Sequence, residues 1–194
     1  DESCPHGVEY HWFGHGSTPT ITPGERVYIV AHGLLRGYAP LVRIDRRRKF
    51  VATTFLRAVG FGTNEEIERL FAGVPGSERF LPATLAKDTT TSQTEAVLEL
   101  YRRLRPGEPI VLDNAQELLR TMFFDYRRYS LERVGRYKMN KKLGVNVPNT
   151  KEYWVLTRDD IVGAMTYLIN LVNGKGDVDD IDHLGNRRVR RVGE

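Results

Sequence analysis

Two short runs rich in β-branched and apolar residues lie in the first quarter of the chain, at residues 27–32 (VYIVAH) and 41–45 (LVRID). Runs of this length and composition, bounded by turn-forming residues, are typical of β-strands. The segment between them contains glycine and proline, which favour a turn. We therefore predict two strands here. The first twenty-five residues show no clear period and are expected to form a loop or irregular β-structure.

From residue 51 onward, apolar residues recur at spacings of three and four, which predicts helices. Several of the predicted helices begin at a residue with a hydroxyl or acidic side chain that can cap the helix. Two pairs have the spacing of capping boxes, namely Thr63 with Glu66 and Ser92 with Glu95. The predicted helices cover residues 51–59, 63–73, 92–104, 113–123 (capped by Asp113) and 157–173 (capped by Thr157 and Asp160), with a short helix or irregular segment at 130–143 and a connection at 74–83.

These elements predict an α+β fold. It has a small antiparallel β-sheet from the N-terminal part, a helical middle and an extended C-terminal return. We assign residues 1–176 to the α+β domain and residues 177–194 to the return segment. A chain of 194 residues is long enough for one domain with a real core, or for two small ones.

Composition narrows the class of protein. Apolar residues make up 40% and charged residues 28%, which is typical of a globular chain. No apolar run approaches the ~20 residues of a membrane span, so we expect no membrane partner. The single cysteine, Cys4, cannot form an internal disulfide, which favours a cytoplasmic location.

The basic residues are clustered, although the net charge is only +4. Clusters on one face would bind a polyanion such as nucleic acid, whereas scattered clusters would serve solubility alone. Tyr126, Tyr129 and Tyr137 are interleaved with arginine and lysine, so these rings either stack on bases or fill the core. The basic clusters lie at residues 43–49, 102–105, 127–128, 133–142 and 187–191.

The last eighteen residues, 177–194, are the most polarised part of the chain. Four aspartates fall within six positions, and four arginines within five follow a Leu-Gly-Asn turn. Arginine can hold a phosphate backbone while a carboxylate contacts a base edge. Two alternatives are ion pairing within the segment and a metal site, but the glycine and distal glutamate of a calcium loop are missing.

Other chemistry has weak support in the sequence. Cys4, His6, His11 and His15 include a zinc-like spacing but lack a second cysteine. Neither a nucleophile elbow nor a phosphate-binding glycine loop is present. We therefore predict no catalytic residue, no metal ligand and no cofactor within this segment.

Several stretches, in this order, resemble the β subunit of bacterial DNA-dependent RNA polymerase. The resemblance covers about residues 36–194, whereas the first thirty-five residues match poorly. The matching stretches are VRIDRRRKF at 42–50 with TTFLRAVG at 53–60, YRRLRPGEP at 101–109, FFDYRRYSLERVGRYKMN at 123–140 and NGKGDVDDIDHLGNRRVRRVGE at 173–194.

The resemblance implies the lobe of that subunit, one jaw of the DNA cleft, with residues 177–194 leading into the neighbouring protrusion. It implies that Asp182 belongs to a pocket for a non-template-strand guanine, lined by Arg187 with Arg190 nearby. Arg46, Arg47 and Arg48 would face single-stranded or downstream DNA. Tyr38 stands after an Arg-Gly pair, where the family usually has a tryptophan that stacks on a base.

The resemblance also implies partners. These are DNA, the β′ and α subunits and a σ factor, within an enzyme that is a nucleotidyltransferase. The catalytic magnesium would be held by β′. We expect a fragment or a truncated form of the subunit. The alternatives are a stand-alone basic nucleic-acid-binding module, or a module that binds σ or a regulator through exposed apolar residues such as Phe61 and Trp154.

Overall fold

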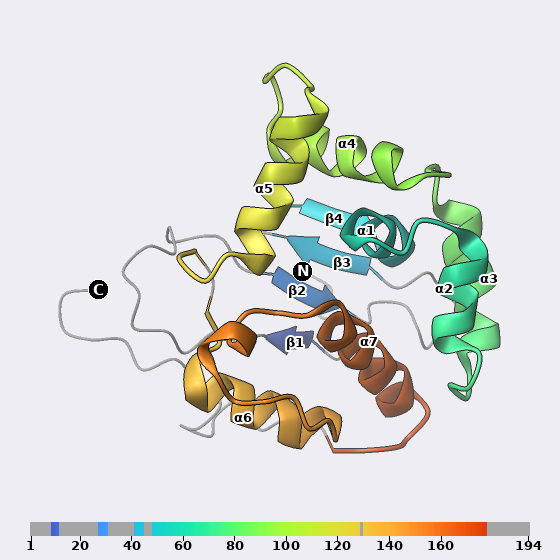
Figure 1. Cartoon of the computed structure of the whole chain (residues 1–194). Coiled ribbons are helices and arrows are strands. Elements are labelled where there is room, and N and C mark those ends of the chain that lie inside the picture. The colour runs from blue at the N-terminus through green and yellow to red at the C-terminus, as the bar shows by residue number, and fades with distance from the viewer. Residues whose placement is uncertain (1–8, 12–26, 31–40, 45–47, 129, 178–194) are drawn as a thin grey trace, which may run out of the picture.

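The structure, a computed structural model, describes residues 9–11, 27–30, 41–44, 48–128 and 130–177 (Figure 1). Within these ranges, strands come first along the chain and helices follow. The elements are β1 (Glu9–His11), β2 (Val27–Val30), β3 (Leu41–Ile44), β4 (Arg48–Val51), α1 (Ala52–Val59), α2 (Asn64–Phe71), α3 (Ser77–Lys87), α4 (Gln93–Leu104), α5 (Leu112–Phe124), α6 (Glu132–Leu143), the 3-10 helix η2 (Lys151–Tyr153) and α7 (Arg158–Val172).

The four strands form an antiparallel sheet in the order β1-β2-β3-β4. β2 and β3 coincide with the two predicted strands, while β1 and β4 add an edge on each side. Val42 of β3 lies opposite Phe50 of β4, and both side chains, like that of Ile44, are almost completely buried. The alternation of a strand therefore directs one face of the sheet into the core.

The helices supply the rest of the core. α1 follows β4 directly and lies beside it, between the sheet and α2 (Figure 1). Phe55 of α1 meets Phe123 of α5 edge to face, with ring centroids 5.4 Å apart. Each fully buried apolar side chain of this size contributes about 1.5–3 kcal/mol through its removal from water. Further core members are Leu56, Ile67, Leu100, Ile161 and Leu168.

Capping residues set the ends of the helices as expected at two places. Thr63 and Thr157 each accept from the backbone N–H three residues later, and Glu66 and Asp160 return the bond. The predicted capping box at Thr63 and the predicted capping of the last helix by Thr157 and Asp160 are therefore confirmed. At Ser92 the predicted box is incomplete. The hydroxyl accepts from Glu95 N, but the Glu95 carboxylate bonds the N–H and hydroxyl of Thr91.

Two predictions for helices are wrong. Residues 74–83 were expected to be a connection, but α3 covers most of them and contains Pro82. Proline in a helix interior costs about 3 kcal/mol, and the burial of Phe80, which contributes about 1.5–3 kcal/mol, offsets part of that cost. Asp113 does not cap α5, because the N-cap is Val111 and Asp113 lies in the first turn.

The predicted helical middle is confirmed, and the segment at 130–143 is a regular helix, α6. Most of the expected C-terminal return, residues 178–194, lies outside the described part of the chain. None of the helices in the described ranges combines the length and the apolar character needed to cross a bilayer.

Candidate nucleic-acid interface

Most of the residues predicted to contact DNA lie outside the described part of the chain. Arg48 is described through its backbone alone, as the first residue of β4, where it pairs with Ile44. The structure therefore defines the scaffold from which the predicted contacts extend. The predicted residues outside the described part are Tyr38, Arg46, Arg47, Asp182, Arg187 and Arg190.

One part of this scaffold is the β3–β4 hairpin, whose strands flank residues 45–47. Arg103 of α4 donates to the backbone carbonyl of Lys49 at 3.4 Å. The same guanidinium lies 5.8 Å from the ring centroid of Phe50, a distance suited to a cation–π contact. β4 is thus tied to α4 as well as to β3, so the strand that follows residues 45–47 is held by two neighbouring elements.

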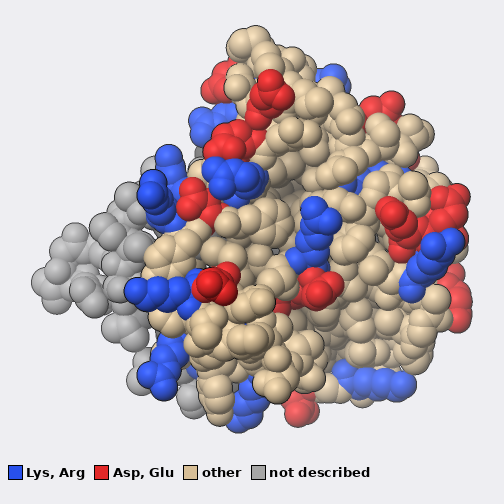
Figure 2. Space-filling model, viewed as in Figure 1, with Lys and Arg blue, Asp and Glu red and all other residues tan. Residues whose placement is uncertain are grey.

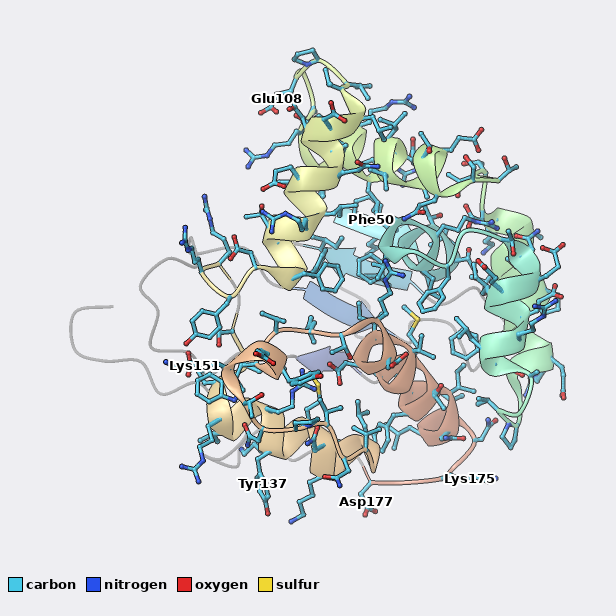
Figure 3. All side chains as sticks on the ribbon, viewed as in Figure 1. Phe50, Glu108, Tyr137, Lys151, Lys175 and Asp177 are labelled. Carbon is cyan, nitrogen blue, oxygen red and sulfur yellow. The ribbon has the colours of Figure 1, made fainter. Side chains whose placement is uncertain are left out.

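A second part holds the first aspartate of the polarised segment. Lys142, near the end of α6, donates to the carbonyl oxygen of Asp177 at 3.0 Å, and the Tyr167 hydroxyl of α7 donates to the same oxygen at 2.8 Å. The ammonium of Lys142 also lies 4.9 Å from the Tyr167 ring centroid. Asp177, labelled beneath these helices in Figure 3, is therefore anchored by both α6 and α7.

A buried ion pair fixes α6 against α7. Nη1 of Arg136 lies 2.8 Å and 2.9 Å from the two carboxylate oxygens of Asp160, and both side chains are almost fully buried. Nε of Arg136 donates to the carbonyl of Tyr153, and Nη2 donates to that of Val155. Because its charge is matched inside the protein, Arg136 serves the fold and is not available to a polyanion.

Arg57 of α1 has the same kind of role. Its Nε lies 3.2 Å from Oδ2 of Asp88, and it also donates to the carbonyl of Gly62 and to the side chain of Asn64. Burial by itself raises the pKa of Asp88, but hydrogen bonds from neighbouring threonines, including Thr90, outweigh that effect and lower the pKa. The ionised form of this carboxyl group is therefore favoured in the folded protein.

The opposite side of α6 carries a different set of side chains. We call Arg133, Val134, Tyr137, Lys138 and Lys141 the outer face of α6. All are exposed, with Val134 at 56% and Tyr137 at 61%. At about 100° per residue they fall within an arc of about 140°. Figure 2 shows basic side chains along the edge where Figure 1 places α6.

The tyrosines of the basic segment therefore separate into different roles. Tyr137 is open to solvent, which supports the base-stacking interpretation over the core interpretation for this residue. Tyr126 is 37% exposed and packs near Trp154, with ring centroids 6.3 Å apart. Tyr129 lies outside the described residues.

The residues predicted as exposed anchors for a protein partner do not fit that role. Phe61 is partly buried and packs against the hydrophobic core. Trp154 is also partly buried, and its Nε1 donates to the side chain of Asn149 at 2.7 Å. The sequence could not separate these aromatic residues from Tyr137, because their exposure depends on packing between distant segments.

Metal-binding chemistry has no candidate in the described ranges, where no group of three or more histidine, cysteine, aspartate or glutamate side chains could hold an ion. The acidic set at Asp179, Asp180 and Asp182 lies outside those ranges. So do Cys4, His6 and His15, and only the backbone of His11 is described, in β1.

Comparison with known proteins identifies relatives of most of the chain. Residues 35–190, which include every predicted DNA contact, match the family model for RNA polymerase Rpb2, domain 2. DNA-directed RNA polymerase subunit beta of Syntrophomonas wolfei is 49% identical over 152 residues, covering 78% of this chain and 13% of the relative. The corresponding protein of Gloeobacter violaceus is 50% identical over 153 residues, covering 79% of this chain and 13% of the relative. The chain thus spans a small part of the length of these curated relatives.

Proposed function

This chain belongs to the RNA polymerase Rpb2 domain 2 family, and from that premise we propose that it is the lobe region of a β subunit of DNA-directed RNA polymerase. In this role it grips DNA in the cleft and contacts the non-template strand. The segment binds and positions DNA. Nucleotidyl transfer belongs to the assembled enzyme, whose magnesium would be held by the β′ subunit.

The family match over residues 35–190 is the observation that carries this proposal, because it includes most of the polarised C-terminal run. Within that run, Asp182 follows the anchored Asp177 by five residues. A carboxylate can accept from a guanine N–H, and an arginine such as Arg187 can hold a base or its phosphate. Anchoring by α6 and α7 supports this arrangement because it limits where the run can begin.

The basic residues between β3 and β4 would supply the second contact. Arg46, Arg47 and Arg48 are consecutive in the sequence, and the strands on either side of residues 45–47 are paired, with β4 tied to α4. Arginines can neutralise phosphates without reading sequence. We further propose that Arg190 supports the guanine pocket and that Tyr38 stacks on a non-template base.

The assembled polymerase that contains this subunit provides the test. Its affinity for a non-template oligonucleotide should fall when the downstream guanine is replaced, by the ~1–3 kcal/mol that a good base contact provides. Asp182→Ala should abolish this preference and leave the salt dependence of binding unchanged, whereas Asp113→Ala, an exposed aspartate on α5, should keep it. A guanine preference that survives Asp182→Ala would refute the pocket assignment.

The remaining partners follow from the same proposal. A lobe in the assembled enzyme has β′, α and σ as neighbours, acts in the cytoplasm and needs no membrane. A second candidate is a stand-alone basic nucleic-acid-binding module, favoured by the exposed basic and aromatic residues of α6. The isolated chain would then bind DNA with an affinity that falls steeply as salt rises.

A further inference from the structure

The outer face of α6 combines three cations with the most exposed aromatic ring among the described residues. Arg133, Lys138 and Lys141 surround Tyr137, which is 61% exposed. Residues 133 and 141 are eight positions apart, so the face is about 12 Å long at 1.5 Å per residue. A surface of this size can contact a few consecutive nucleotides.

Among the described residues, the cations of this face form no ion pairs within the protein. Within the described part of the chain, no carboxylate lies within ion-pair distance of Arg133, Lys138 or Lys141. Arg102, Arg103 and Arg120 differ, since each is paired with a glutamate on its own helix. A row of unpaired cations attracts a polyanion and releases its counterions when the polyanion binds.

The ring and the rigidity of the helix narrow the choice of ligand. A solvent-facing tyrosine can stack on an unpaired base, whereas the bases of a duplex are stacked on each other and are closed to it. The buried Arg136–Asp160 pair fixes which side of α6 faces outward. The face is therefore pre-organised, and binding does not have to order the helix.

We propose that the outer face of α6 is a second nucleic-acid contact, at which the cations bind phosphates and Tyr137 stacks on a base of single-stranded DNA without regard to sequence. This inference rests on the proposed function for the identity of the polymer. It concerns different residues from the guanine pocket, so the two are tested by different measurements. The pocket is tested by guanine preference and the outer face by affinity that does not depend on sequence.

The test measures binding of a fluorescent twelve-nucleotide oligothymidine to the full chain by anisotropy, over a series of salt concentrations. Tyr137→Ala should weaken binding about five-fold or more, because stacking contributes at least ~1 kcal/mol per base. Tyr137→Phe keeps the ring and should bind like the unaltered chain. Arg133→Glu should reduce the slope of log K against log salt by about 0.7 for each phosphate that the protein no longer neutralises.

Matched controls separate this surface from general charge effects. Arg69→Glu on α2 makes the same substitution on an exposed arginine of another helix, on a different side of the molecule (Figure 1). It should leave the affinity within about two-fold of the unaltered chain, since changes in distant charges are screened beyond ~10 Å in 0.1 M salt. Circular dichroism of each variant verifies that the helices remain intact.

Any of four results would overturn the inference. The first is equal loss of affinity in Arg133→Glu and Arg69→Glu, which would indicate an effect of net charge. The second is unchanged binding in Tyr137→Ala. The third is binding to a duplex of the same length that is as tight as binding to the single strand. The fourth is failure of the unaltered chain to bind oligothymidine at low salt while it binds poly-glutamate through these residues, which would assign the face to an acidic protein.

Discussion

The arginines of α4 and α5 and the basic residues of α6 look alike in the sequence but have opposite surroundings. On α4, Glu99 pairs with both Arg102 and Arg103, at 3.1 Å and 2.6 Å. On α5, Glu117 forms a two-point contact with Arg120, and this contact lowers the pKa of Glu117 to about 2. On the outer face of α6, the described cations have no such neighbours. The difference is that glutamates neutralise the arginines of α4 and α5, whereas no ion pair of the described residues includes a cation of the outer face of α6.

α6 also divides its own charges between two roles. Arg136 faces inward and is neutralised by Asp160, while Arg133, three residues earlier, faces outward. The inward arginine holds the helix in place, and the outward cations are thereby presented to solvent. Because the buried Arg136–Asp160 pair holds α6 in place, its removal should disturb the outer face of α6 more than any other single change.

The largest effect is expected from Arg136→Ala. Removal of one partner from a buried ion pair leaves the other charge unmatched and costs about 3–5 kcal/mol. We expect the free energy of unfolding, measured with urea, to fall by that amount, and α6 to lose its fixed orientation. Lys138→Ala, two residues further along the same helix but exposed, should change it by less than about 0.5 kcal/mol.

A double variant distinguishes the effect of the charge pair from that of packing. Arg136→Met with Asp160→Asn removes both charges and keeps most of the side-chain volume. Because no unmatched charge remains, we expect this variant to be more stable than Arg136→Ala. A double variant no more stable than the single one would show that the ion pair is not the cause of the effect.

The next effect concerns the second buried pair and depends on pH. The pKa of Asp88 is lowered in the folded protein, so the folded state holds the ionised carboxylate more strongly than the unfolded state does. Ionised Asp88 therefore makes its full contribution to the free energy of unfolding above its pKa in the unfolded chain, which is about 3.9. That contribution is lost as the pH falls through the lower pKa of Asp88 in the folded protein. Urea unfolding between pH 6 and pH 2 should show this loss.

Asp88→Asn is the matching variant. It removes a charged acceptor from Arg57, Thr54 and Thr90. It should lower stability at pH 6 by about 1.5–3 kcal/mol, the usual range for hydrogen bonds to a charged group. Its stability should also fall less than that of the unaltered chain as the pH is lowered. An equal decline in both proteins would assign the acid sensitivity to other carboxyl groups.

The sequence predicts the local features of this fold better than the pairing of distant residues. The capping box at Thr63 and the cap formed by Thr157 and Asp160 depend on residues three apart, and both are present as predicted. The partner of Arg136 is 24 residues away, so a single sequence cannot show that Arg136 is buried and Arg133 exposed. Helix α3 was missed for the same reason, since its proline argues locally against a helix that core packing favours.

In the candidate interface, too, the sequence predicts local clustering of residues but not their contacts with distant segments. The sequence identified the basic and aromatic segment around α6, because clustering of charge is visible without a structure. It could not assign Tyr137 to solvent, or Phe61 and Trp154 to partly buried positions. Those assignments depend on how α6, η2 and the core pack together. The guanine pocket remains a prediction from residues that lie outside the described ranges.

The smallest effect tests whether carboxylate neighbours alone distinguish α4 from α6. Glu99→Gln removes the partner of both Arg102 and Arg103 and should make these arginines available to a polyanion. Each additional phosphate that the protein neutralises should steepen the dependence of log K on log salt by about 0.7 for single-stranded DNA, so we expect an increase of roughly 0.7 to 1.4 in the oligothymidine assay. Glu68→Gln on α2 changes the net charge equally and serves as the control. If the two variants bind alike, pairing with Glu99 is not what keeps α4 from binding DNA.

The exposed ring of Tyr137 would then be the feature that separates α6 from α4. The tyrosine of α4, Tyr101, is buried, so α4 has no exposed ring of its own.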